Sequence, residues 1–209
     1  VRVGQLIAEP AGFVSAPVHA SVSGTVSDVT PYPDFLGKKV LTVVIDTDGE
    51  QWEEGIDRSP EIRHEITSSP EDVFKRISES GIVGLGGAAF PTHVKLTPPE
   101  GMKPEYLILN GAECEPYLTA DYRLMLEHGQ EILLGGELMR RTLGAGVNGI
   151  IGIEANKPRA IELMRELTSK SLQWKVVPLK KRYPQGGEKQ LIDAVLGRRV
   201  ASFALPVST

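Results

Sequence analysis

Cysteine is almost absent from this sequence, since Cys114 is the only one among 209 residues. A single cysteine excludes an intrachain disulfide framework, an iron–sulfur cluster held by this chain alone and a zinc site made only of cysteines. The four histidines form neither an i, i+4 pair nor an HExxH motif. We therefore expect no metal site supplied by this chain itself.

Long apolar runs and an excess of basic charge are missing as well. The strongly apolar segments, such as residues 40–45, fall far short of the roughly 20 residues of a membrane-spanning helix, so we expect no direct membrane insertion. The 23 Lys and Arg face 27 Asp and Glu, a net charge of −4, which disfavours a general nucleic-acid binder. GxSxG and GxxxxGK(S/T) motifs are absent too, which disfavours serine hydrolases and P-loop NTPases.

The hydrophobic content of 41% is enough to bury a core, and its pattern changes along the chain. Residues 1–48 indicate an all-β region, with short alternating segments at 13–14, 18–22, 25–27 and 40–45. Glycines and prolines separate these segments: Gly12, Pro17, Gly24, Pro31, Pro33 and Gly37. Residues 49–68 are charged and have no period, so we expect a connector there. Because the chain starts without Met and ends in an irregular segment, we expect a fragment of a longer protein.

Residues 69–209 have the pattern of an α/β domain. A helix is predicted to begin after Ser69, with Pro70 at its first position, and to end at Gly81. Strands are then expected at 106–109, 149–153 and 174–177, and helices at 127–143, at 158–167 and from the end of the loop 180–187 to Gly197. Strands that alternate with helices of this length predict a layered α/β domain with a mainly parallel sheet.

The first motif with chemical meaning is the glycine-rich segment 81–95. Gly84, Gly86 and Ala89 match the spacing of the dinucleotide fingerprint, but that fingerprint follows a strand, whereas this segment follows a helix. Glycines allow successive N–H groups to converge on an anion, and Lys95 lies close enough in sequence to neutralise a phosphate. The segment alone leaves two interpretations open, a phosphate-binding loop and a structural turn.

The second motif, residues 110–116, follows a predicted strand, where active groups of open α/β sheets collect. If the segment is extended, Glu113 and Glu115 project to the same side. Such a pair can accept hydrogen bonds from ribityl or ribose hydroxyls, help to bind a metal or act in acid–base chemistry, and the alternative is a solvated acidic loop. Cys114 lies between these carboxylates, which disfavours a thiolate, so we do not expect a nucleophile.

The third motif, residues 183–190, has paired glycines at the start of a helix. It suits a backbone contact to an anion or a ring carbonyl, with Tyr183 offering its face to a flat ligand. The alternative is simple helix capping, with Glu188 near the N-terminus. Because all three motifs are expected at the same kind of sheet edge, we predict that they share one pocket.

Together these motifs resemble the RnfC family, the flavin-carrying member of the Rnf electron-transport complex. The segments that carry the resemblance are 81–96, 110–117 and 183–192. Residues 9–26 are similar to the family's barrel-sandwich region, which is related to lipoyl domains, although the modifiable lysine of lipoyl domains is missing. The resemblance implies a Rossmann-like FMN-binding α/β domain with a mainly parallel sheet over residues 69–209, preceded by a small all-β barrel-sandwich region over residues 1–48.

The same motifs occur in the FMN-binding subunit of respiratory complex I, and this similarity implies individual roles. FMN contacts are implied for Gly84, Gly86, Gly87, Lys95, Asn110, Glu113, Gly186 and Glu188. Lys95 would lie near the phosphate or the ribityl chain, and Asn110 and Glu113 at the ribityl and ring edge. Phe90 and Glu115 match positions that face the nicotinamide nucleotide. Two residues depart from the family pattern: Ala112, where complex I has an acid, and Ala89, where glycine is frequent.

The function implied by the resemblance is that of an NADH:ferredoxin oxidoreductase subunit, peripheral to the cytoplasmic face of the cell membrane and bound to other Rnf subunits. FMN would accept hydride from NADH, and electrons would pass to two 4Fe–4S clusters in a part of the subunit that this chain lacks. The fragment alone is therefore expected to be inactive. Two alternatives remain at this stage, a cobalamin reductase of bacterial microcompartments and a non-catalytic scaffold module.

Overall fold

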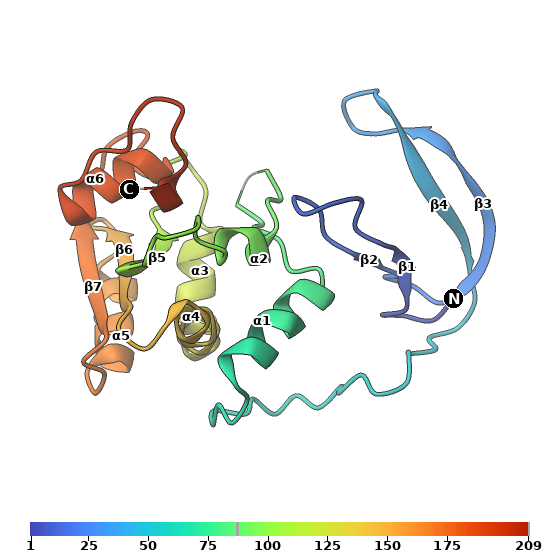
Figure 1. Ribbon diagram of the computed structural model, residues 1–209, viewed down its shortest axis with the longest axis horizontal. Coiled ribbons are helices and arrows are strands. Elements are labelled where there is room, and N and C mark those ends of the chain that lie inside the picture. Colours follow the sequence, from blue (N-terminus) through green and yellow to red (C-terminus); the bar gives the residue numbers. More distant parts are fainter. Residues whose placement is uncertain (87, 209) are drawn as a thin grey trace. The chain divides into compact units, whose positions relative to one another are not determined.

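The computed structural model describes residues 1–86 and 88–208, so Gly87 of the glycine-rich motif lies outside the described residues. The chain divides into two units. Unit 1 consists of Val1–Glu61 and Ile77–Val94, and unit 2 consists of Ile62–Arg76 and Lys95–Thr209. In Figure 1 the strand pairs of unit 1 lie at the blue end of the chain and the α/β unit at its red end.

Unit 1 is built from two antiparallel strand pairs. β1 (Leu6–Ala8) pairs with β2 (Val18–His19), and β3 (Gly24–Pro33) pairs with β4 (Lys39–Thr47) in a long hairpin. The all-β character predicted for residues 1–48 is therefore confirmed. The buried hydroxyl of Ser23 fixes the base of the hairpin, since it donates to the carbonyl of Asp48 at 3.0 Å and accepts from the N–H of Gln51 at 3.0 Å.

Two details of the predicted strand pattern are wrong. β3 runs through Pro31 and Pro33, although the sequence pattern predicts that these prolines interrupt it. In a two-stranded ribbon, each strand has an outer edge whose N–H groups have no partner strand, and prolines two residues apart fit on that edge without loss of a ladder hydrogen bond. Residues 13–14 form a bend and not a strand.

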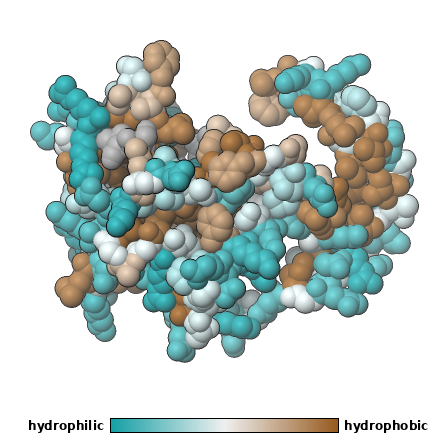
Figure 2. Space-filling model, in the orientation of Figure 1, coloured by the Kyte–Doolittle hydropathy of each residue, from teal (hydrophilic) through white to brown (hydrophobic). Residues whose placement is uncertain are grey.

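The hairpin of unit 1 carries an apolar surface. Large apolar side chains are exposed along β3, along β4 and in the turn between them: Val29, Tyr32, Phe35, Leu36 and Leu41. Figure 2 shows these strands as a largely brown, hydrophobic band. Exposed apolar area of this extent is unusual for a surface that faces only water.

The helix α1 (Pro70–Glu79) begins and ends at the predicted residues. The Oγ of Ser69 accepts a hydrogen bond from the N–H of Asp72 at 3.1 Å, which satisfies one free donor of the first turn. Gly81 follows the helix with φ +65°, and a Cβ at this position would lie 2.4 Å from the carbonyl oxygen of Pro17. Only glycine fits this end of the helix.

A parallel three-stranded sheet forms the centre of unit 2. Its strands lie in the order β5 (Tyr106–Gly111), β6 (Asn148–Glu154) and β7 (Trp174–Leu179). The helices α3 (Ala120–Glu127), α4 (Gly129–Leu143) and α5 (Pro158–Thr168) cover one face of this sheet, and α6 (Glu188–Leu196) covers the other (Figure 1). The remaining elements are the short helix α2 (Thr92–Lys95) and the 3-10 turn η1 (Pro206–Ser208). The predicted layered α/β architecture with a parallel sheet is confirmed.

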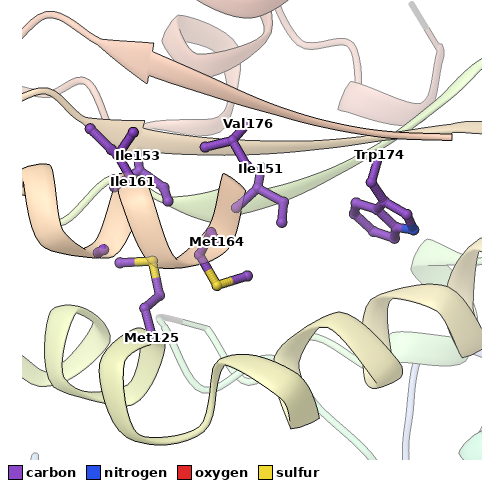
Figure 3. Close-up of a cluster of buried hydrophobic side chains, with 8 residues drawn as sticks. Met125, Ile151, Ile153, Ile161, Met164, Trp174 and Val176 are labelled. Carbon is purple, nitrogen blue, oxygen red and sulfur yellow. The ribbon is translucent and has the colours of Figure 1, made fainter. Parts of the chain in front are cut away.

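The main core of unit 2 lies between the sheet and the helices α3 to α5 (Figure 3). Ile151 and Ile153 of β6 are almost inaccessible and pack with the fully buried Met164 of α5. Each such side chain contributes roughly 1.5–3 kcal/mol through burial. The alternate residues of β6 face α6, because a Cβ at Gly152 would lie 2.9 Å from the side chain of Leu191. Both faces of β6 therefore pack against helices, and the α6 face holds a second apolar cluster of Ala112, Leu179 and Leu191.

The helix α3 is absent from the predicted pattern, which places a loop at 110–117 and the next helix from 127. Its N-cap residue Thr119 makes no side-chain capping bond. The cap comes from the preceding loop, where Oε1 of Glu113 accepts from the N–H of Asp121 at 3.0 Å. A carboxylate at a helix N-terminus is favourable, but here it is brought there by tertiary structure, from a residue that does not adjoin the helix in the sequence.

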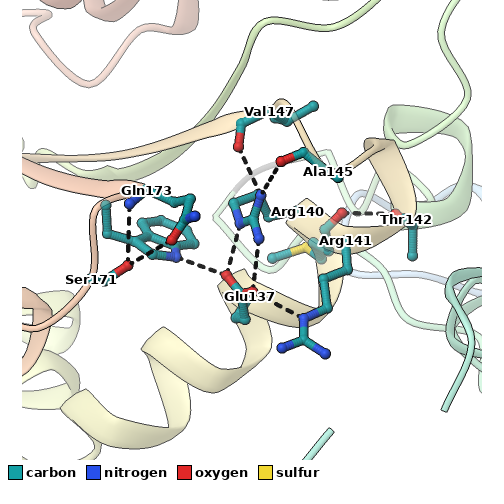
Figure 4. Close-up of polar contacts among 10 residues, drawn as sticks. Glu137, Arg140, Arg141, Thr142, Ala145, Val147, Ser171 and Gln173 are labelled. Carbon is teal, nitrogen blue, oxygen red and sulfur yellow. Dashed lines mark hydrogen bonds and ion pairs between the residues drawn. The ribbon is translucent and has the colours of Figure 1, made fainter. Parts of the chain in front are cut away.

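A charged cluster on α4 holds the end of the sheet opposite the carboxyl ends of the strands (Figure 4). Glu137 accepts two hydrogen bonds from Arg140, at 2.8 and 2.9 Å, and one from the ring N–H of Trp174 at 3.0 Å. Arg140 in turn donates to the carbonyl of Val147 at 2.8 Å. The hydrogen bonds from Arg140 are the main reason why the pKa of Glu137 falls to about 2. This cluster ties α4 to Val147, which directly precedes β6, and to Trp174, the first residue of β7, and is structural.

Candidate functional site

The loops that follow β5, β6 and β7 meet at one edge of the sheet in unit 2. All three strands are parallel, so their carboxyl ends lie together, and the register pairs Gly111 with Ile153 and Glu154 with Leu179. Ligands of open α/β sheets bind outside this edge. The predicted residues Asn110, Glu113, Gly186 and Glu188 all belong to the loops or element ends that gather there.

Asn110 joins the loop after β5 to the loop after β7. Its Nδ2 donates to the carbonyl oxygen of Gly186 at 2.8 Å, and its Oδ1 accepts from the N–H of Ala112 at 3.1 Å. Gly186 lies so close to the first loop that a Cβ would be 2.6 Å from the carbonyl oxygen of Ala112 and 3.2 Å from Sγ of Cys114. The structure thus brings the second and third sequence motifs into direct contact. The exposed Glu188 begins α6 two residues after Gly186.

Glu113 and Glu115 differ in burial, in a segment that leaves the strand after Gly111. Glu113 is buried, with Oε1 bonded to the N–H of Asp121 and Oε2 lying 3.4 Å from Nζ of Lys157. Glu115 is exposed, at a bend of the chain. The free N–H groups at the start of α3 and the positive charge of Lys157 draw Glu113 inward.

Negative charge accumulates around these loops. Burial raises the pKa of Asp121, and the nearby carboxylates of Glu113 and Glu115 raise it further. The ammonium group of Lys157 balances part of this charge, and it also lies 4.9 Å from the centre of the Tyr122 ring. The site therefore combines several carboxyl groups with a largely buried lysine.

Glu154, the last residue of β6, is a site residue that sequence reasoning missed. Its side chain is 1% exposed, and Oε1 has no hydrogen-bond partner among the residues that the structure describes. Burial raises the pKa of this carboxyl, Lys157 and Lys181 oppose the rise, and Glu113 and Glu115 add to it. A usable signal was present, because a glutamate directly after a run of buried apolar and glycine residues is placed at the carboxyl end of a central strand.

The glycine-rich motif forms a closed loop in unit 1. Val83 pairs with Pro91 in an antiparallel bridge, and the N–H of Gly84 donates to the carbonyl of Phe90 at 2.9 Å. The tip of the loop is open, since a Cβ at Gly86 would meet nothing within 4 Å. Ala89 has φ +51°, a left-handed conformation that favours glycine.

The other predicted residues near this motif are accessible. Phe90 is half-buried, and Lys95 is exposed at the end of α2, on the part of the chain that belongs to unit 2. That the glycine-rich loop shares a pocket with the second and third motifs stays a prediction. Among residues 1–86 and 88–208, no group of three or more His, Cys, Asp or Glu side chains is arranged to hold a metal ion. No helix in this part of the chain is long and apolar enough to cross a membrane.

A parallel sheet flanked by helices, with polar loops packed together at its carboxyl edge, defines a Rossmann-like α/β binding domain. Residues 77–209 match the Nuo51 FMN-binding domain, and residues 1–50 match the RnfC barrel sandwich hybrid domain. The chain therefore belongs to the Nuo51 FMN-binding domain family and, with its matching N-terminal domain, is of the RnfC type.

Several curated relatives are similar over nearly the whole chain. The C subunit of the proton-translocating ferredoxin:NAD(+) oxidoreductase complex of Clostridium ljungdahlii is 46% identical over 207 residues, 99% of this chain and 44% of the relative. The C subunit of the Na(+)-translocating ferredoxin:NAD(+) oxidoreductase complex of Acetobacterium woodii is also 46% identical over 207 residues, 99% of this chain and 46% of the relative. The chain thus spans less than half the length of these relatives.

A solved structure, that of an NAD+-reducing [NiFe]-hydrogenase in the air-oxidized state, has a similar fold. Its TM-score is 0.53 at 22% sequence identity, and the similarity covers 62% of this chain and 24% of the hydrogenase chain. At this identity the similarity concerns the fold alone.

Proposed function

We propose that this chain is the FMN-binding part of an NADH:ferredoxin oxidoreductase subunit of the RnfC type. The observation that carries the proposal is the FMN-binding domain match over residues 77–209, which contains every residue predicted from the sequence to contact FMN or the nicotinamide nucleotide. The names of the relatives, as C subunits of ferredoxin:NAD(+) oxidoreductase complexes, support the reaction.

The carboxyl edge of the sheet fits FMN. The ring system and ribityl chain of FMN offer carbonyl oxygens, ring nitrogens and hydroxyls, and such groups bind to convergent amides and carboxyls in a largely apolar setting. Unit 2 provides the side-chain amide of Asn110, the backbone of Gly186 and the buried, unpaired carboxyl oxygen of Glu154. An unpaired buried oxygen at this edge is the feature that a polar ligand would complete.

The residues of the chain bind and orient the cofactor in this proposal. Bound FMN would supply the redox chemistry, because a flavin can take up two electrons as hydride and give them up one at a time. The hydrogen bond between Asn110 and Gly186 holds the loop after β5 against the loop after β7. Glu113 fixes the loop after β5 to α3 and to the start of α5, through its contacts with Asp121 and Lys157. The backbone of the glycine-rich loop near Gly84 and Gly86 is proposed to contact FMN, with the N–H groups at its tip and the charge of Lys95 holding the phosphate. Phe90 and Glu115 are proposed to face NADH.

The larger assembly is part of the same proposal. Electrons would leave for two 4Fe–4S clusters outside these 209 residues, because a single cysteine cannot hold a cluster. Other Rnf subunits would be the partners, at the cytoplasmic face of the membrane. We propose domain boundaries after residues 48 and 68, which give a barrel-sandwich region, a connector and an FMN-binding domain over residues 69–209.

Titration of the chain with FMN tests the proposal. Binding is expected to quench the flavin fluorescence and to saturate at one FMN per chain. A folded chain that leaves the fluorescence unchanged up to about tens of micromolar FMN, a concentration range that detects even weak cofactor sites, would contradict it. Circular dichroism of the same sample establishes that the chain is folded.

A further inference from the structure

Glu154 is the most unusual group of the site, because it is a buried acid with an unpaired oxygen. Its side chain is 1% exposed, and Oε1 lacks a hydrogen-bond partner among the described residues. Buried polar atoms in folded proteins are almost always paired, and each exception calls for an explanation, such as a functional role or a bound water, ion or ligand. The position of Glu154 at the carboxyl end of β6 is also the position where ligands of such sheets bind.

The neighbouring lysine does not neutralise this carboxyl by direct pairing. Nζ of Lys157 lies 3.4 Å from Oε2 of Glu113, and it also contacts the ring face of Tyr122. The backbone N–H of Lys157 donates to the main-chain carbonyl of Glu154 at 2.9 Å, and not to its side chain. The position of the Lys157 ammonium group is thus explained by Glu113, and Oε1 of Glu154 keeps room for another partner.

Glu154 lies on the same face of the sheet as Asn110. The register pairs Asn110 with Gly152, and Glu154 is two residues further along the same strand. Paired residues of neighbouring strands, and alternate residues of one strand, project to the same face. This is the face of α6, where Asn110 holds the loop that contains Gly186. Glu154 and the Asn110–Gly186 contact are therefore parts of one site.

We propose that Glu154 is a further ligand-binding residue of the FMN site, where its protonated carboxyl donates a hydrogen bond to an uncharged acceptor oxygen of the cofactor, such as a carbonyl of the flavin ring. This inference rests on the proposed FMN function and deepens it. An uncharged acceptor fits better than the phosphate, because the carboxylates of Glu113 and Glu115 act on the same position and repel an anion.

Burial favours the protonated form of Glu154, and charged groups around it act in both directions. Groups from all three loops act on it, with Glu113 and Glu115 from the loop after β5, Lys157 from the turn after β6 and Lys181 from the loop after β7. Burial is the largest influence and raises the pKa, the two lysines lower it, and the two glutamates raise it again. Lys181 is exposed, so solvent weakens its effect.

Affinity for FMN in two variants of the 209-residue chain tests this role. Glu154→Gln keeps the size and a hydrogen-bond donor, so we expect a dissociation constant within about threefold of the wild-type value. Glu154→Leu removes the donor and is expected to bind about tenfold more weakly. Glu166→Gln, at an exposed position of α5, is the matched control and should leave binding unchanged. If Glu154→Leu is folded and binds as the wild type does, or if Glu154→Gln binds as weakly as Glu154→Leu, the proposal is overturned.

The pH dependence gives a second readout that does not need the leucine variant. An ionised carboxylate has no proton to donate, so wild-type affinity should fall as the pH rises, whereas the amide of Glu154→Gln does not titrate. The FMN phosphate also ionises as the pH rises, but it does so for both proteins, so its effect cancels in the ratio of the two dissociation constants. We expect this ratio, wild type over Glu154→Gln, to rise with increasing pH once the Glu154 carboxyl ionises. A ratio that falls as the pH rises would overturn the proposal. If the wild-type chain does not bind FMN at all, the proposed function fails; if it binds but the variants are alike, only the role of Glu154 fails.

Discussion

Nζ of Lys157 lies 3.4 Å from Oε2 of Glu113, and this ion pair joins the loop after β5 to the start of α5. The two side chains are only 14% and 3% exposed. A pair so well shielded from water is costly to break on one side, because the remaining charge stays buried without its partner. The pair therefore holds the loops of the proposed cofactor site in place.

Lys157→Met should destabilise the chain by about 3 kcal/mol, because it leaves the Glu113 carboxylate buried beside α3 without its ammonium partner. Urea denaturation followed by circular dichroism measures this loss. The double variant Lys157→Met with Glu113→Gln is expected to regain part of the stability. Lys170→Met, at an exposed position, is the control; equal stability of the Lys157 and Lys170 variants would show that the pair contributes little.

Acid should weaken the fold through Glu137. Its pKa is lowered from 4.5 to about 2, mainly by Arg140, so the unfolded chain takes up this proton near pH 4.5 and the folded chain only near pH 2. The ionised Glu137 therefore adds about 2–3 kcal/mol to the free energy of unfolding. This contribution is fully present above about pH 5 and is lost as the pH falls toward 2. Chemical denaturation at a series of pH values measures it. Glu137→Gln should have a flatter profile over this range, and an unchanged slope in that variant would refute the assignment.

Two glycines should respond differently to alanine. Gly186→Ala places a Cβ 2.6 Å from the carbonyl oxygen of Ala112, so it should lower the free energy of unfolding by about 1–3 kcal/mol and also weaken FMN binding. Gly86→Ala meets nothing within 4 Å, so it should leave stability within about 0.5 kcal/mol and weaken only FMN binding.

The matched control for both is Gly146→Ala, which also meets nothing within 4 Å and lies outside the proposed site. Thermal denaturation and FMN titration on the three variants separate a packing role from a binding role. Unchanged FMN affinity in Gly86→Ala would remove the glycine-rich loop from the site.

Charge reversal at Lys95 distinguishes a cofactor-binding module from a scaffold. Lys95→Glu should abolish detectable FMN binding, because a negative charge would face the phosphate, while stability changes little at this exposed position. Lys103→Glu reverses an exposed charge that has no proposed contact with FMN and is the control. FMN affinity that falls equally in both variants would indicate a general charge effect and not a specific contact.

Much of the α/β fold follows from local sequence signals. Ser69 and Pro70 begin α1 where the sequence predicts, and glycines at positions 81 and 197 follow the ends of α1 and α6 in left-handed conformations. These signals work because a cap or a positive φ is a local requirement of the backbone. Strand positions follow equally well from short apolar runs, although β5 and β7 each extend two residues further than predicted.

The features that the sequence did not predict depend on contacts between distant residues. α3 is capped by Glu113, a residue of the preceding loop, whereas the adjoining Thr119 makes no side-chain capping bond. Glu154 looks like an ordinary polar residue at a strand end, and only the folded sheet shows that it is buried and unpaired. The difference in burial between Glu113 and Glu115 has the same origin, since Lys157 lies more than forty residues away in the sequence.

Amide chemical shifts recorded during an FMN titration test most directly whether loops from both units hold one cofactor. We expect the backbone N–H signals of Gly86, Ala112 and Gly186 to shift together, with a single dissociation constant. Shifts confined to the loops of unit 2, or signals that do not respond at all in a folded chain, would contradict the shared site.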